Sequence, residues 1–195
     1  MSKQTIQFST PQPILVNSLL DLNILHSPTV SNNYTRLDFF ATDFCDFPAH
    51  LERIYQKNGV KKLSYNDALQ LALSLSEQIN HLEQRKGAYL TLDPSKVFVV
   101  DERHFIYLDE QLFSLNKNQT IQITCPFSKK RDLAPELLAI DKLPCYISHK
   151  CAYYSLGTLV SSCLIPLEQL KGTKLHSFLQ RCLEKEPEER TLLYL

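Results

Sequence analysis

The side chains that could carry out chemistry lie closest together in residues 88–113. Three carboxylates stand there, at Asp93, Asp109 and Glu110. Asp93 could act as a general base, but a carboxylate directly before Pro94 is also typical of a turn. Asp109 and Glu110 could form an acid–base couple or a solvated turn after a strand. Both interpretations stay open for these groups.

The histidines and cysteines show no spacing typical of metal ligands. We expect the histidines at positions 50 and 81 to lie at exposed or rim positions of helices. The six cysteines contain no C-x-x-C pair, and several stand among apolar neighbours. This pattern favours buried, reduced thiols over disulfides or zinc ligands. We therefore expect no metal ion and no cofactor.

Composition excludes several classes of protein. The 195 residues carry 21 basic and 21 acidic side chains, so no net charge favours nucleic acid or an anionic membrane. No apolar run is long enough to span a bilayer, and the N-terminus lacks the apolar core of a signal peptide. The four glycines are too few and too scattered for a glycine-rich phosphate loop. We expect a cytoplasmic protein that binds neither membranes nor nucleic acid.

Helix and strand patterns predict the elements that position the carboxylates. Pro48 in a first turn and Gly59 at a C-terminus bound one predicted helix. Ser64 caps a longer helix, whose apolar residues recur at helical spacing up to Gly87. Two short apolar runs, at 97–100 and 105–108, predict a hairpin. Further strands are predicted at 5–8, 14–16, 36–40 and 120–124, with a turn of helix at 19–25 that Pro28 ends. The fold class is α+β, mainly α, in one domain.

Three motifs near the C-terminus stand in a characteristic order. Ala134-Pro135-Glu136 comes first, followed by Lys-Cys-Ala-Tyr-Tyr-Ser-Leu-Gly at 150–157 and then by Arg190 in a Pro-x-x-Arg turn. This order resembles the large lobe of a protein kinase. The resemblance implies a C-lobe at 41–195 and a truncated or rebuilt N-lobe remnant at 1–40. It also implies structural roles for Pro135 and Gly157, and a buried ion pair between Glu136 and Arg190.

The same resemblance assigns the segment 88–113 to the catalytic loop and the metal-binding turn. In that register Thr91 replaces the general base, and Lys96 replaces the asparagine that binds magnesium. Asp109 keeps the place of one metal-binding aspartate. An ammonium cannot coordinate magnesium, so we expect Lys96 to form a salt bridge with Asp109 instead. Ala152 replaces the aspartate that anchors the catalytic loop from below.

The resemblance therefore implies a catalytically inactive kinase-like protein, a pseudokinase that acts as a scaffold, decoy or inhibitor by binding another protein. One alternative is a divergent nucleotide-binding kinase in which Asp93 and Asp109 still handle a nucleotide. Another is a structural or assembly protein that forms a homo-oligomer.

Two segments are candidate partner-binding surfaces. Four phenylalanines could pack internally, which we favour, or form an exposed patch. A basic loop stands where kinases have their activation segment and could be solvated or bind an acidic partner. The residues are Phe39, Phe40, Phe44 and Phe47 for the first segment and Lys129, Lys130 and Arg131 for the second.

Overall fold

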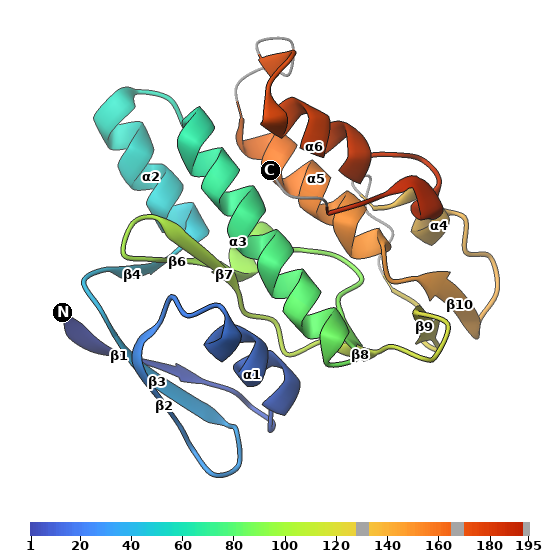
Figure 1. Cartoon of the computed structure of the whole chain (residues 1–195), viewed down its shortest axis with the longest axis horizontal. Coiled ribbons are helices and arrows are strands. Elements are labelled where there is room, and N and C mark those ends of the chain that lie inside the picture. Colours follow the sequence, from blue (N-terminus) through green and yellow to red (C-terminus); the bar gives the residue numbers. More distant parts are fainter. Residues whose placement is uncertain (128–132, 165–169, 193–195) are drawn as a thin grey trace.

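The computed structural model describes residues 1–127, 133–164 and 170–192. Helices and strands both contribute substantially, so the predicted α+β class is confirmed. Figure 1 shows a small sheet with one helix at the N-terminal end, two long helices in the middle, and a C-terminal group of helices beside a short β-ribbon.

The N-terminal sheet has three antiparallel strands in the order β1-β3-β2. These are β1 (Ser2–Gln7), β2 (His26–Val30) and β3 (Arg36–Ala41). Pro28 was predicted to end a helical turn, but it lies in β2, where the pairing with β3 shifts between His26 and Thr29. A proline is accommodated there because β2 is an edge strand.

Helix α1 (Pro13–Asp21) covers the sheet. The prediction of a strand at 14–16 was therefore wrong. Pro13 occupies the first turn, and the buried residues Leu15, Val16 and Leu19 lie on one helical face. A short apolar run fits both a strand and one turn of a helix. Here Leu19, which follows Leu15 and Val16 at helical spacing, shows that the run belongs to a helix.

The middle of the chain follows the prediction closely. Strand β4 (Phe44–Asp46) leads into α2 (Phe47–Asn58), whose first turn is capped by Asp46 and which ends at Gly59 with φ of 71°. Helix α3 (Tyr65–Gln84) begins at Ser64, whose hydroxyl accepts a hydrogen bond from the Asp67 amide at 3.2 Å. Both caps satisfy backbone groups that the helix itself leaves free.

The predicted hairpin is present as β6 (Val97–Val100) and β7 (His104–Tyr107), and β4 pairs with β6 to complete a sheet. A 3₁₀ turn, η1 (Pro94–Lys96), precedes it. Strand β5 (Gly87–Ala88) pairs with β8 (Phe113–Ser114). Strands β9 (Thr120–Ile123) and β10 (Cys145–Ser148) form an antiparallel ribbon.

The C-terminal part consists of α4 (Pro135–Leu138), α5 (Cys151–Cys163), α6 (Lys174–Cys182) and the 3₁₀ turn η3 (Pro187–Glu189). The main core lies between α3, α5, α6 and the hairpin. Gly157 lies where α5 meets α6, and a Cβ atom there would be 2.9 Å from the Cβ of Cys182. Glycine is thus required for this close approach.

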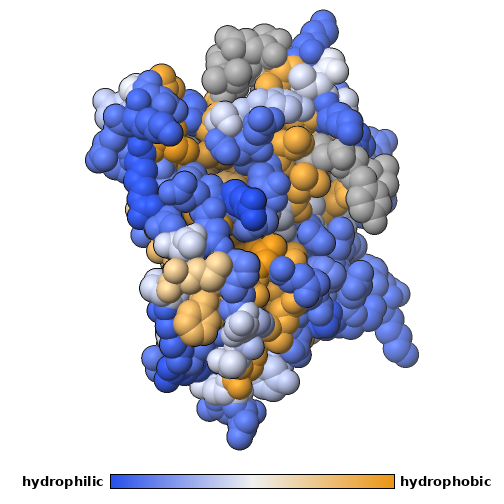
Figure 2. Space-filling model, turned by 60° about the vertical axis from the view of Figure 1, so that its left-hand side comes forward, coloured by the Kyte–Doolittle hydropathy of each residue, from blue (hydrophilic) through white to orange (hydrophobic). Residues whose placement is uncertain are grey.

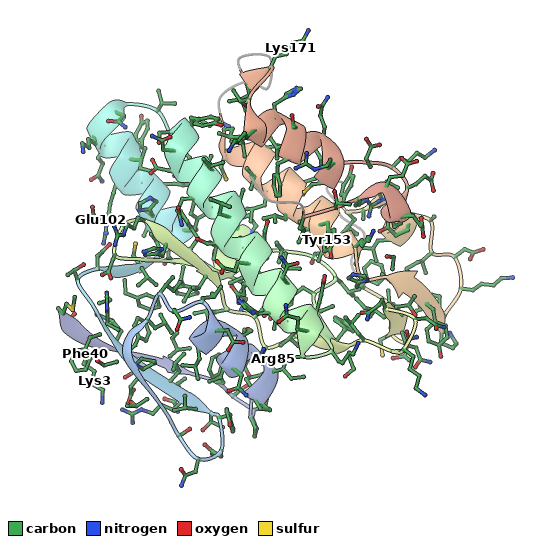
Figure 3. The ribbon with its side chains drawn as sticks, in the orientation of Figure 1. Lys3, Phe40, Arg85, Glu102, Tyr153 and Lys171 are labelled. Atoms are coloured by element: carbon green, nitrogen blue, oxygen red, sulfur yellow. The ribbon has the colours of Figure 1, made fainter. Side chains whose placement is uncertain are left out.

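The phenylalanines at 39–47 are mostly internal, so the exposed-patch interpretation was wrong. Phe39 and Phe47 are 1% and 0% exposed. The Phe44 ring stacks on Phe98 at 5.4 Å and meets Phe39 edge to face at 5.3 Å. Only Phe40 is exposed, at 42%, because alternate residues of β3 point to opposite faces of the sheet. Figure 3 shows Phe40 beside Lys3 on the N-terminal sheet.

The N-terminal layer also packs directly against the hairpin. The core between α1 and the sheet includes Val100 and Ile106 from β6 and β7. Figure 2 shows the corresponding side of the molecule, where hydrophobic side chains run along a band in the middle of a mostly hydrophilic surface. Through this shared core, the N-terminal sheet with α1 and the hairpin of β6 and β7 bury surface against each other.

Glu136 and Arg190 form the predicted buried ion pair. The Arg190 guanidinium is 0% exposed and donates to both carboxylate oxygens of Glu136, at 2.6 and 2.8 Å. It also donates to the backbone carbonyls of Lys150, Glu184 and Lys185. Its carbon atom Cζ lies 5.1 Å from the centre of the Tyr154 ring.

We predict that Glu136→Ala lowers the free energy of unfolding by roughly 3–5 kcal/mol, because it leaves a buried guanidinium without a counter-charge. Urea denaturation followed by circular dichroism measures the loss. Glu77→Ala, at an exposed position of α3, is the control and should change stability by less than about 0.5 kcal/mol. Equal effects of the two substitutions would contradict the prediction.

Candidate functional site

A pocket of about 470 Å³ lies between the loop at 89–94, the turn after β7 and one face of α5. Its walls include the hydroxyl-bearing residues Ser155, Thr158 and Ser162 of α5, and apolar side chains such as Phe113, Phe127 and Leu133. Thr91, Asp93 and Asp109, which were predicted as site residues, all line this pocket. The fold thus brings together residues that are up to 73 positions apart in the chain, from Tyr89 to Ser162.

Three hydroxyl groups hold the loop at 89–94 in place. The Ser155 hydroxyl accepts a hydrogen bond from the Leu92 amide at 2.7 Å. The Tyr107 hydroxyl accepts one from the Asp93 amide at 3.0 Å. The Tyr89 hydroxyl donates to the carbonyl of Asp109 at 3.0 Å and so connects the loop to the turn after β7.

The loop is therefore anchored to α5. The Ser155 hydroxyl supplies the anchor, one helical turn after Ala152, the position where the resemblance implied that an anchoring group is lost. The sequence contained this signal only as a serine on the buried face of an apolar helix, which is also common without any such contact.

Two buried tyrosines form the floor between the loop and the hairpin. The Tyr89 and Tyr107 rings meet edge to face at 4.7 Å. Burial raises the pKa of both hydroxyl groups, which therefore stay protonated at neutral pH. Gln78 of α3, itself buried, donates to the Tyr107 carbonyl and accepts from the Tyr107 amide, both at 2.8 Å. Gln78 thus fixes β7 to α3, a role that sequence reasoning missed.

The two pocket aspartates are engaged in turns. Asp93 accepts hydrogen bonds from the amide and the hydroxyl of Ser95, at 2.9 and 2.8 Å. Asp109 accepts from the Gln111 amide at 3.0 Å and from the Tyr107 hydroxyl at 3.4 Å. These contacts agree with the turn interpretation of Asp93, and they leave each carboxylate at the pocket wall.

The predicted salt bridge between Lys96 and Asp109 was wrong. Lys96 is exposed, and Asp109 is absent from the ion pairs formed among the described residues. Lys96 is the last residue of the turn η1, which has no buried residues, and its side chain lies at the surface just before buried Val97 begins β6. Lys96 contributes to the site through its backbone carbonyl, which accepts from the Leu108 amide at 2.8 Å.

Glu110 forms a clamp rather than an acid–base couple with Asp109. Its carboxylate accepts hydrogen bonds from the backbone amides and the hydroxyls of Ser9 and Thr10. These contacts, led by the Ser9 hydroxyl, lower the pKa of Glu110. The turn after β7 is thereby tied to the segment that precedes α1.

A second contact ties the other end of α1 to α3. Arg85 pairs with Asp21 at 2.6 Å, and Figure 3 shows Arg85 beside α1. Helix α1 is thus attached at both ends, to the turn by Glu110 and to α3 by Arg85.

The remaining predicted groups take structural positions or lie outside the described residues. His50 is buried against Phe105, so its predicted rim position was wrong. Lys129, Lys130 and Arg131 fall in 128–132, outside the described residues.

Over the described ranges there is no group of three or more histidine, cysteine, aspartate or glutamate side chains that could hold a metal ion. No helix within those ranges is long and apolar enough to cross a membrane.

Comparison with known proteins adds no relative. No protein-family model matches the chain, and no curated protein matches it.

We predict that Ser155→Ala destabilises the loop at 89–94, because the Leu92 amide loses its partner in a buried position. The expected cost is roughly 1–3 kcal/mol, with faster hydrogen exchange at the Leu92 amide. Ser162→Ala is the control, since the Ser162 hydroxyl contacts only atoms of its own helix, the Leu159 carbonyl and the Cys163 sulfur, among the described residues. Unchanged exchange at Leu92 would show that Ser155 does not anchor the loop.

Proposed function

We propose that this protein is a catalytically inactive kinase-like domain that acts by binding another protein. One observation carries the proposal. The loop at 89–94 and the turn after β7 are held firmly against each other, yet the side chains that they present cannot transfer a phosphoryl group. A loop and turn that keep their fixed arrangement but lack the side chains for phosphoryl transfer favour a binding role.

The kinase-like part of the proposal is supported by the order of elements from α2 to η3 and by the contacts between them. The bidentate pair of Glu136 with Arg190 and the close approach at Gly157 are the relations that the resemblance implies. Pro135 stands in the first turn of α4, which directs Glu136 toward Arg190.

The site does not fit magnesium and nucleotide. Phosphoryl transfer requires metal ligands, a cradle for the phosphates and a group that positions the nucleophile. The pocket presents Asp109 as one possible metal ligand and Thr91 in the place of the base, while the Lys96 side chain faces solvent. We derive no catalytic step from this arrangement.

The N-terminal layer offers no replacement lysine on β1. Lys3 pairs with Asp38 at 3.0 Å and shares the outer face of the sheet with Phe40. The strands β1, β2 and β3 with α1 agree with the proposed N-lobe remnant at 1–40, in which the missing elements are those that would cover the phosphates.

The pocket is the surface that we propose for the partner. It combines apolar walls with hydroxyls and two carboxylates, which suits an extended peptide segment that needs both contact area and hydrogen bonds. Phe127 and Leu133, which precede and follow residues 128–132 in the sequence, are lining residues.

A divergent nucleotide-binding kinase is the second candidate, favoured by the position of Asp93 and Asp109 on one pocket. Under our proposal, ATP with magnesium leaves the melting temperature unchanged and no self-phosphorylation occurs. A nucleotide at a hundredfold excess over its Kd would stabilise the protein by about 2.7 kcal/mol, or about 5–10 °C at this chain length. Such a shift, measured by differential scanning fluorimetry, would favour the second candidate.

We further predict that Thr158→Arg abolishes capture of the partner from host lysate, because an arginine on α5 fills the pocket. Gln56→Arg, on the exposed side of α2, adds the same charge and should retain capture. The measurement is quantitative mass spectrometry of proteins retained by each variant. A partner that binds both variants equally would place its docking surface elsewhere, and a self-associating chain would appear as a concentration-dependent mass in light scattering.

A further inference from the structure

A buried cluster of three polar side chains lies on the side of α3 away from the hairpin. Glu83 comes from the last turn of α3, His149 from the link between β10 and α5, and Tyr153 from the first turn of α5. Figure 3 shows Tyr153 on α5 beside α3. The side chains of Glu83 and His149 are only 17% and 12% exposed.

The hydrogen-bond geometry fixes where most of the hydrogens lie. The His149 Nδ1 atom is 2.7 Å from the carbonyl oxygen of Gln119, which can only accept, so Nδ1 carries a hydrogen. The Tyr153 hydroxyl donates to Oε2 of Glu83 at 2.9 Å. The His149 Nε2 atom lies 3.5 Å from Oε1 of Glu83 and 3.5 Å from the Tyr153 hydroxyl, whose hydrogen is directed to Oε2 of Glu83 by the shorter contact.

The pair of atoms Oε1 and Nε2 needs one proton between them. Oε1 of Glu83 is buried and has no hydrogen-bond partner among the described residues. If Glu83 is ionised and His149 is neutral, two lone pairs face each other away from water, which is costly. If either group carries one added proton, that proton lies between the two atoms and satisfies both.

We propose that Glu83 and His149 share a single proton in the native protein, and that this proton fastens the β9–β10 ribbon to α3 and α5. Loss of the proton above neutral pH loosens the ribbon. The proposal does not rest on the proposed function.

The ribbon depends on this cluster through Gln119, the residue directly before β9. Its carbonyl accepts from Nδ1 of His149 and, at 3.3 Å, from the His149 backbone amide. The neighbouring pair Ser148 and Thr120 closes the ribbon at the same end. The imidazole of His149 therefore lies between the ribbon and the two helices.

The surroundings agree with one shared proton. Burial raises the pKa of Glu83 to about 7, against the lowering effects of the Tyr153 hydroxyl and the Lys150 ammonium. Burial also lowers the pKa of His149, and Lys150 lowers it further while the Gln119 carbonyl opposes the change. Cys182 of α6 is the other titratable group that acts on Tyr153. The proton therefore resides mainly on Glu83.

These directions fix how stability depends on pH. The folded state binds the Glu83 proton more tightly than the unfolded chain does, so its contribution is complete below the ordinary pKa of 4.5 and is lost as pH rises to about 7. Neutral His149 contributes above its ordinary pKa of 6.5, and that contribution is lost as pH falls.

Glu83→Gln is the test, because a glutamine amide can donate to Nε2 and its oxygen can accept from Tyr153 without a titrating proton. Urea midpoints of both proteins are measured from pH 5 to 8.5. The wild-type midpoint should fall relative to that of the variant as pH rises from 5 to 7.5. Amides of the ribbon should gain exchange, beyond the intrinsic pH effect, in the wild type only. Parallel profiles would overturn the proposal.

A second measurement serves if the variant fails to fold. Imidazole nitrogen spectra of the wild-type protein should show His149 as a neutral ring protonated on Nδ1 at pH 6. A His149 ring that is fully charged at that pH, or that carries its hydrogen on Nε2 alone, would overturn the proposal.

Discussion

The buried guanidinium of Arg190 is the interaction on which the C-terminal half of the molecule depends. It joins Glu136 of α4 to the carbonyl at the start of α5 and to two carbonyls after α6. A charge in this position is tolerated only when all its partners are present, because desolvation otherwise exceeds the gain. The pair therefore specifies one arrangement of these helices.

Helix α3 is the common support of the parts that bear on function. Its Gln78 fixes β7, which carries Tyr107, whose hydroxyl holds the Asp93 amide of the pocket loop. Its last turn carries Glu83 to the link before α5. Arg85, just after it, holds α1. The pocket, the ribbon and the N-terminal layer are thus all attached to α3, one long helix that packs in the core.

Local signals predicted the middle of the fold, and long-range contacts account for what was missed. Gly59 and Ser64 could be interpreted without the structure because helix caps depend on adjacent residues. The pairing of Glu136 with Arg190 came from a resemblance, not from a local pattern. By contrast, Ser155, Gln78 and Glu83 form hydrogen bonds with residues 29 to 70 positions away in the sequence. Nothing in the sequence distinguishes these three from ordinary helix residues. The Lys96 prediction failed because it considered charge and not the place of Lys96 at the end of the exposed turn η1.

The clamp formed by Glu110 and the contact of Arg85 with Asp21 oppose movement of the N-terminal layer against the rest of the chain. Enzymes that close around a ligand need one part to rotate against another about a few hinge residues. Here α1 is fastened at one end to the turn after β7 and at the other end to α3. The N-terminal layer and the rest of the chain are thereby braced as one body. A surface of constant shape loses little entropy when a partner docks, so the bracing would lower the cost of binding to this surface.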